Sequence, residues 1–220
     1  MNINPLLSIV IPTRNRQKYA ICCIQSILHI DNSQIEVVVQ DNSDTNELEF
    51  LLAKSKIDDR LVYHFDPKPM STVHNFNKAM EHVKGEYLCF IGDDDGINPD
   101  IIEAAIWAKK NNLDALVEKT HIYYLWPSDS RTGKQFIYPF TGKINDVNIK
   151  NELEKFLKDG GVYYLNYDLP KVYHGIVKKE SFDYVANVLG YYFGGLSADI
   201  FTSIALSLYM KRVVAIDYPL

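Results

Sequence analysis

Three consecutive aspartates, Asp93, Asp94 and Asp95, follow a short apolar run and precede Gly96. Three adjacent carboxylates do not stay ionised in a small space without a cation, because like charges raise one another's pKa. Hard oxygen ligands at this density suit Mg²⁺ or Mn²⁺, which usually complete their coordination with water and substrate phosphates. The alternative is a solvated acidic turn, since aspartate near the start of a helix interacts favourably with the helix dipole. The triplet taken alone fits both interpretations equally well.

Two more polar segments follow apolar runs in the same manner. Residues 13–15 (Thr-Arg-Asn) come after the run 6–11, and residues 41–43 (Asp-Asn-Ser) come after the run 35–39. Because ligands of open parallel α/β sheets bind at the carboxyl ends of strands, we expect all three polar segments at one edge of a sheet. None of them contains GxGxxG or GxxxxGK(S/T), which excludes a dinucleotide fingerprint and a phosphate-binding P-loop.

The elements that must position these segments alternate between strand and helix over the first 120 residues. Short continuous apolar runs, typical of strands buried on both faces, predict strands at residues 6–11, 35–39, 61–65, 87–91 and 115–118. Helical spacing and capping residues predict helices at residues 20–28, from 44 onward, at 73–83 and at 98–110. This alternation implies right-handed βαβ units and a mostly parallel α/β sheet.

After residue 120 the periodicity loosens and tyrosine becomes frequent, with 12 of the 15 tyrosines in this part. Residues 126–143 combine turn residues and aromatics without a sustained period, so we interpret them as a loop or hairpin. The remaining predicted elements are a helix at 146–158, a strand at 172–177, helices at 180–189 and 197–210, and a strand at 213–216. The sequence stops at Leu220 in what reads as the middle of an element, so we expect a truncated or naturally short chain.

Composition excludes several classes of protein. A formal net charge of −5 argues against a protein that binds nucleic acid through the phosphate backbone, which requires clustered positive charge. Three cysteines, of which Cys22 and Cys23 are adjacent, cannot build a disulfide framework, so we expect a reducing, cytoplasmic setting. No basic leader and no run of about 18 apolar residues is present, so we expect neither a signal peptide nor a membrane span.

The ordered set SIVIPTRNR, VVVQDNSD and GEYLCFIGDDDGINPD resembles family 2 glycosyltransferases of the GT-A fold, over roughly residues 6–120. The resemblance implies a Rossmann-like fold and inverting transfer from a nucleotide-diphosphate sugar, with a UDP-sugar as the expected donor and Mn²⁺ or Mg²⁺ as cofactor. It also implies a nucleotide-sugar-binding half, residues 1–120, and an aromatic-rich acceptor-side half of the same domain, residues 121–220.

The resemblance assigns roles to residues by their place in the motifs. The nucleotide contacts that it implies are Pro12, Thr13, Arg14, Asp41 for the uracil ring, Asn77 for the diphosphate, and Asp93 for the ribose and diphosphate. Asp94 is the implied metal ligand and Asp95 the second candidate. Two positions depart from the family pattern: Gly92 stands where many relatives carry an aspartate, and Gln40 where an additional acid is common. No arginine flanks Asn77, which leaves Asn75 and Lys78 as alternative diphosphate contacts.

Two residues of the second half complete the implied site. Asp199, before the apolar helical segment, takes the place of the family's general base; the alternative is that it caps the helix, a role that Ser197 could also fill. His174 is implied to contact the donor phosphate or the acceptor, and a purely structural histidine is the alternative.

The expected partners are a nucleotide-diphosphate sugar and a saccharide or lipid-linked saccharide acceptor, without nucleic acid. The pairs Lys178–Lys179 and Lys211–Arg212 would allow peripheral contact with the inner face of a membrane. A nucleotidyltransferase is disfavoured because no Gly-rich basic loop follows the first strand. A nucleotide-sugar-binding module without transfer activity is the main alternative function.

Overall fold

The apolar runs of the first 120 residues form strands, as their composition predicts. The protein is described here by a computed structural model that covers residues 4–54, 58–125, 127 and 132–220. The five strands of this part are β1 (Leu7–Thr13), β2 (Ile35–Asp41), β3 (Leu61–Phe65), β4 (Tyr87–Phe90) and β5 (Ala115–Glu118). Every residue of β2, β4 and β5 is buried, because helices cover both faces of the sheet.

Four helices alternate with these strands: α1 (Gln17–Leu28), α2 (Glu47–Ala53), α3 (Thr72–Met80) and α4 (Ile101–Lys110). The predicted capping box at Asp44 is wrong, since α2 begins after Asn46. The Asp44 carboxylate instead accepts hydrogen bonds from Arg14 and Asn15, at 3.3 and 2.9 Å, and is therefore tied to the loop after β1.

The second half adds short strands and three helices: β6 (Ile122–Leu125), β7 (Lys134–Ile137), β8 (Ile144–Asp146), α5 (Ile149–Lys158), the 3₁₀ turn η1 (Tyr164–Asn166), β9 (Ile176–Lys178), α6 (Lys179–Leu189), α7 (Ala198–Tyr209) and β10 (Val213–Ile216). β6 and β7 pair as the hairpin predicted within 126–143, although β6 lies just before it and residues 126 and 128–131 lie outside the described residues. The predicted helix start at Asp146 is wrong, because Asp146 pairs with Val214 of β10.

The strands of both halves interleave in one sheet, in the order β3-β2-β1-β4-β9-β5-β10-β8. β1, β2, β3 and β4 are mutually parallel, as are β5 and β10. β9 runs antiparallel between β4 and β5, and β8 is an antiparallel edge strand. The mostly parallel α/β sheet predicted from the sequence is confirmed, and the reversal of strand order beside β1 creates the switch point at which such sheets bind ligands.

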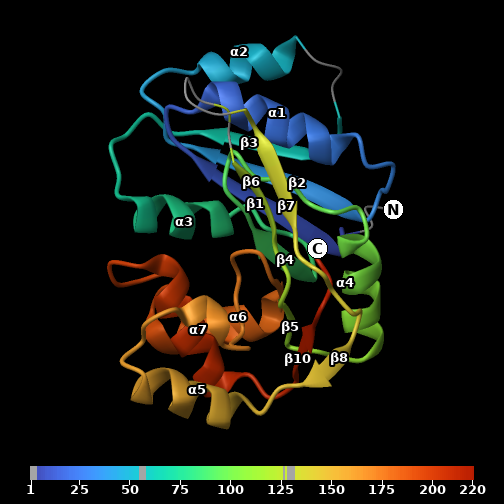
Figure 1. Ribbon diagram of the computed structural model, residues 1–220. Helices are drawn as coiled ribbons and strands as arrows, with labels where there is room; N and C mark the ends of the chain where they lie inside the picture. Colours follow the sequence, from blue (N-terminus) through green and yellow to red (C-terminus); the bar gives the residue numbers. More distant parts are fainter. Residues whose placement is uncertain (1–3, 55–57, 126, 128–131) are drawn as a thin grey trace.

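The sheet lies between two layers of helices (Figure 1). An apolar core fills the space between the sheet and each layer. α1, α2 and α4 pack on one face, and α3, α5, α6 and α7 pack on the other. The two faces of one strand feed different cores, as shown by Ile9 and Val10 of β1. Within the described part of the chain, no helix combines the length and apolarity that crossing a bilayer requires.

A stacked pair of histidines joins β3 to the segment after α3. The rings of His64 and His82 lie 3.3 Å apart between centroids and 10° from parallel. Burial lowers the pKa of both rings, and Lys78 and Lys84 add to the effect while Glu81 opposes it. The native state therefore binds fewer protons than the unfolded state once the pH falls below the ordinary histidine pKa of 6.5.

We expect the melting temperature to fall as the pH is lowered from about 7 to about 5, because stability that is present above about pH 6.5 is lost below it. His82→Phe keeps a ring against His64 and removes one titrating group, so it should flatten this dependence. His74→Gln, at an exposed position of α3, is the matched control. Equal pH dependence of melting in both variants would contradict the assignment.

Candidate functional site

The carboxyl ends of β1 and β4 meet, and the first polar contact of the site forms there. Thr13 Oγ1, at the end of β1, donates to Asp93 Oδ2 at 2.6 Å. Both side chains are buried. The predicted gathering of the first and third polar segments at one sheet edge is therefore confirmed for these residues.

Arg16 is the cation of this cluster, and its role was not predicted from the sequence. It lies just before α1, donates from Nε to Asp93 Oδ1 at 2.6 Å, and also pairs with Asp94 through its terminal nitrogen. The hydrogen bond to Asp93 raises the pKa of Arg16, with further support from the charge of Asp94. Its position between a strand end and a helix start was the available signal.

Asp95 turns away from this cluster toward the second half of the chain. Its Oδ2 accepts the backbone N–H of Gly92 at 2.8 Å and lies 3.3 Å from Nε2 of His174 and 3.4 Å from the Tyr173 hydroxyl. Burial alone would raise the pKa of Asp95, but the hydrogen bonds from His174, Gly92 and Tyr173 hold it below its ordinary value.

Gly92 makes this packing feasible. A Cβ at position 92 would lie 2.7 Å from both Asp95 Oδ2 and the Tyr173 hydroxyl, so any side chain would have to displace them. Glycine thus replaces the aspartate that the family pattern has at position 92, and the Tyr173 hydroxyl lies in the space that a side chain here would need.

His174, which lines the site, has an uncommon backbone conformation. Its φ of +61° lies in the left-handed region, and its N–H donates to the carbonyl of Phe90 at 3.0 Å. A Cβ on the following Gly175 would lie 2.4 Å from the carbonyl oxygen of Lys171, so glycine is required there. β9 begins only at Ile176, so the predicted strand 172–177 is shorter than expected. Of its first four residues, Tyr173 forms an isolated bridge with Phe90 of β4.

A second imidazole–carboxylate pair lies beside His174. His121 Nδ1 is 3.3 Å from Oε1 of Glu118, which is 5% exposed at the end of β5. The rings of His121 and His174 are 6.1 Å apart in an edge-on arrangement. This pair was not predicted from the sequence, although a glutamate that ends an apolar strand is the same signal that identified the aspartates.

Asp199 lies in the first turn of α7, where the helix dipole favours a negative charge. The hydroxyl of Tyr164 donates to Asp199 Oδ2 at 3.1 Å. Burial raises the pKa of Tyr164, as does the charge of Asp199, so the phenol stays protonated as a donor. Ser197 is the N-cap residue but makes no capping bond through its side chain.

Buried Lys171 fixes the turn that carries Tyr164. Its Nζ donates to the carbonyl of Tyr167 at 3.0 Å and to that of Leu165 at 3.5 Å, and it lies 6.0 Å from the centre of the Tyr164 ring. Burial lowers the pKa of Lys171 to about 8. Lys171 thus holds the turn that contains Tyr164, and the Tyr164 hydroxyl in turn donates to Asp199.

The other predicted nucleotide contacts lie around the ends of β1 and β2. Asp41 is fully buried, and its oxygens accept from the Ser43 N–H at 2.9 Å and the Tyr63 hydroxyl at 2.8 Å. Pro12 is a partly buried residue within β1. Arg14 is exposed and points to Asp44, with its other terminal nitrogen 3.5 Å from a backbone carbonyl.

Asn77 and Asn75 differ in what they contact. The Asn77 amide donates to the carbonyl of Phe193 at 2.8 Å and accepts hydrogen bonds from the N–H groups of Tyr192 and Phe193. It therefore stabilises the loop that contains these two residues and does not contact the aspartates. Asn75 Nδ2 lies 3.3 Å from the carbonyl of Thr13, and its buried Oδ1 has no partner among the described residues. Of the two, Asn75 lies nearer to the nucleotide side of the predicted site.

One cavity of about 1000 Å³ brings the metal, base and acceptor candidates together. Asp94, Asp95, His174 and Asp199 all line it. The predicted nucleotide contacts do not line it and form the adjoining cluster, which Arg16 connects to the cavity through Asp93 and Asp94.

Asp94 and Asp95 suit a divalent cation. The side chain of Asp94 is 35% exposed and that of Asp95 is 32% exposed, and both line the cavity. Asp94 already attracts a cation, the guanidinium of Arg16. Across the described ranges, no group of three or more His, Cys, Asp or Glu side chains is arranged to hold a metal. Two carboxylates fit a cation that takes further oxygen ligands from substrate phosphates.

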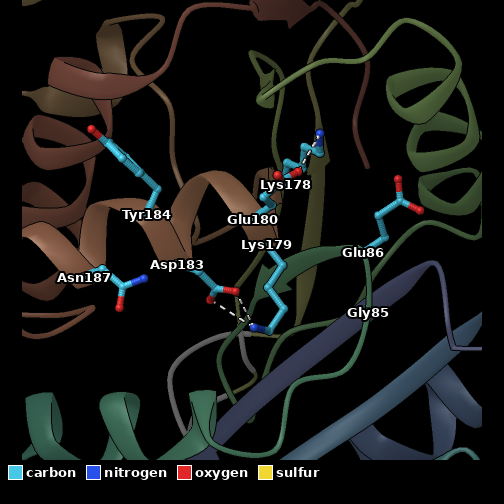
Figure 2. A pocket seen from close by; sticks show the side chains of 8 residues that line it. All are labelled: Gly85, Glu86, Lys178, Lys179, Glu180, Asp183, Tyr184 and Asn187. Atoms are coloured by element: carbon cyan, nitrogen blue, oxygen red, sulfur yellow. Dashed lines mark hydrogen bonds and ion pairs between the residues drawn. The ribbon is translucent and has the colours of Figure 1, made fainter.

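A second hollow lies at the opposite end of the sheet, between α6 and the start of β4, and Figure 2 shows its lining. Lys179 Nζ contacts both carboxylate oxygens of Asp183, at 2.9 and 2.7 Å, and Lys178 Nζ lies 3.1 Å from Glu180. Both lysines of this pair are therefore partnered by carboxylates in the hollow.

Comparisons with known proteins agree with this fold. The model of the family described as "Glycosyl transferase family 2" matches residues 8–166. The GalNAc(5)-diNAcBac-PP-undecaprenol beta-1,3-glucosyltransferase of Campylobacter jejuni is 30% identical over 93 residues, which are 41% of this chain and 30% of that enzyme. The chain matches about a third of the length of such curated relatives.

Two solved structures share the fold. S. aureus TarS (residues 1–349) superposes with a TM-score of 0.67 at 18% identity, over 96% of this chain and 58% of that one. The mannosyltransferase PcManGT of Pyrobaculum calidifontis, solved with GDP-Man and Mn²⁺, gives a TM-score of 0.61 at 17% identity, over 99% of this chain and 56% of that one. TarS has also been solved with UDP-GlcNAc.

Proposed function

Because the chain belongs to glycosyl transferase family 2, we propose that it is an inverting glycosyltransferase that moves a sugar from a nucleotide-diphosphate sugar to an acceptor hydroxyl. A UDP-sugar is the proposed donor, and TarS, which shares the fold, has been solved with UDP and UDP-GlcNAc. The observation that carries the proposal is the cavity that joins Asp94 and Asp95 to Asp199.

The proposed reaction divides the work between the cavity and the adjoining cluster of Thr13, Arg16 and Asp93. Asp199, oriented by Tyr164, accepts the proton of the acceptor hydroxyl as that oxygen attacks the anomeric carbon. Thr13 and Asp93 hold the donor at the switch point, and Arg16 supplies positive charge beside the phosphates. Asp94 and Asp95 would hold Mn²⁺ or Mg²⁺, which when bound stabilises the charge of the departing diphosphate.

The proposed acceptor is a saccharide, free or lipid-linked. The name of the Campylobacter relative gives a saccharide linked to PP-undecaprenol as that enzyme's acceptor. Names of relatives also suggest a role in surface polysaccharide synthesis. The three cysteines are free thiols, which supports the proposed cytoplasmic setting.

Calorimetric titration with UDP, GDP, CDP and dTDP, each with and without Mn²⁺, tests the donor proposal. We expect one nucleotide, UDP, to bind, and Mn²⁺ to increase its affinity at least tenfold because a bound cation offsets the repulsion between the carboxylates and the diphosphate. Binding without transfer to any saccharide acceptor would favour a nucleotide-sugar-binding module. Failure of all four nucleotides to bind would contradict the proposed function.

A further inference from the structure

The hairpin of β6 and β7 forms a two-stranded sheet separate from the central sheet (Figure 1). Residues of this hairpin line the cavity. Tyr124 of β6 pairs directly with Gln135 of β7, so their side chains lie on the same face, together with Ile122. All three line the cavity that holds Asp199. Tyr123, from the other face, also reaches the cavity.

This face is apolar and unusually open to solvent. Every residue of both hairpin strands is exposed, and Tyr124 is 50% exposed even though it lines a cavity. A cluster of exposed apolar side chains indicates a binding surface, because soluble proteins seldom leave such clusters exposed to water. The hairpin thus forms one side of the cavity, to which it contributes the aromatic ring of Tyr124 and the amide of Gln135.

The charges of the other residues that line the cavity indicate the chemical class of the ligand. Four carboxylates line the cavity, those of Asp94, Asp95, Glu118 and Asp199, together with the imidazoles of His121 and His174. No lysine or arginine among the described residues lines it. An anionic group that does not bind the cation proposed for Asp94 and Asp95 would therefore be repelled here. Carboxylates and an amide bind hydroxyl groups, and a tyrosine ring covers the apolar face of a sugar.

We propose that the hairpin face formed by Ile122, Tyr124 and Gln135 is the acceptor subsite and binds a neutral pyranose, with Tyr124 stacked on the sugar ring and Gln135 bound to its hydroxyls. This inference rests on the proposed function, because it makes the sugar the acceptor for Asp199. It specifies a neutral terminal sugar rather than a phosphate or a uronic acid as the group presented to the donor.

Ligand-observed saturation-transfer NMR tests the subsite in the presence of UDP. The probes are the methyl glycosides of glucose, galactose, mannose, N-acetylglucosamine and N-acetylgalactosamine, with methyl glucuronide as the anionic probe. At least one neutral glycoside should bind, and the glucuronide should not. Tyr124→Ala should weaken that binding roughly tenfold, and Tyr124→Phe should preserve it.

Phe136→Ala is the matched control, because Phe136 lies on the same hairpin but on the opposite face, where its cross-strand partner is Tyr123. It should leave glycoside binding unchanged. Equal losses in Phe136→Ala and Tyr124→Ala, or no neutral glycoside bound by the wild type, would overturn the subsite. UDP binding measured on the same samples reports separately on the proposed function, so the two failures can be told apart.

Discussion

Asp199→Asn is expected to leave UDP binding unchanged and to lower sugar transfer by about 10²–10⁴-fold, the usual worth of a general base. The amide keeps the shape of the carboxylate and can still accept from the Tyr164 hydroxyl, but it cannot take a proton from the acceptor. Transfer from radiolabelled donor and calorimetry with UDP measure the two effects separately. Normal turnover in this variant would remove Asp199 from the role of base.

Two companion variants separate catalysis from helix capping. Ser197→Ala should change transfer little, because the Ser197 side chain makes no capping bond to α7. Tyr164→Phe removes the hydroxyl that donates to Asp199 Oδ2 and orients this carboxylate, so it should lower transfer and leave UDP binding unchanged. If Asp199→Asn instead lowered the melting temperature and abolished UDP binding together, its role would be structural.

The fold of the first 120 residues was well predicted from the sequence for a physical reason. Strands such as 35–39 are buried on both faces, so their apolar runs are unbroken and the polar residues that end them stand out. Asp93 and Thr13, found in this way, contact one another across the switch point. Local patterns suffice here because each motif lies directly after its own strand.

The second half was less predictable because its key contacts join residues far apart in the chain. β9 has only three residues and lies between β4 and β5, a placement that no local pattern encodes. Asn77 matched a motif position, yet its amide binds the loop at 192–193, since a small polar side chain at a helix surface takes the partners that tertiary packing supplies. Arg16 was missed because its role arises from Asp93 and Asp94, which follow a different strand far along the chain. Glu118 was missed although its partner His121 is only three residues away.

Asp94→Ala is expected to abolish the dependence of UDP affinity on Mn²⁺, which calorimetry of the variant with and without the metal measures directly. The carboxylate is the most exposed of the three aspartates of the triplet and lines the cavity, so it is the ligand best able to share a cation with a diphosphate. Asp44→Ala, which removes an exposed carboxylate paired with Arg14 outside the cavity, is the matched control and should keep full Mn²⁺ dependence. A Mn²⁺ effect that survives in Asp94→Ala would place the metal on other ligands.

The ion pair between Arg16 and Asp94 adds a second expectation to the same titrations. Without nucleotide, the guanidinium already neutralises Asp94, so Mn²⁺ has to compete with a tethered cation and should bind weakly by itself. A diphosphate changes this balance, because it brings oxygen ligands for the metal and an anionic partner for Arg16. Metal and nucleotide should therefore bind with positive cooperativity, each raising the affinity of the other by the same factor. Tight Mn²⁺ binding to the nucleotide-free protein would show that the pair with Arg16 does not regulate access to Asp94.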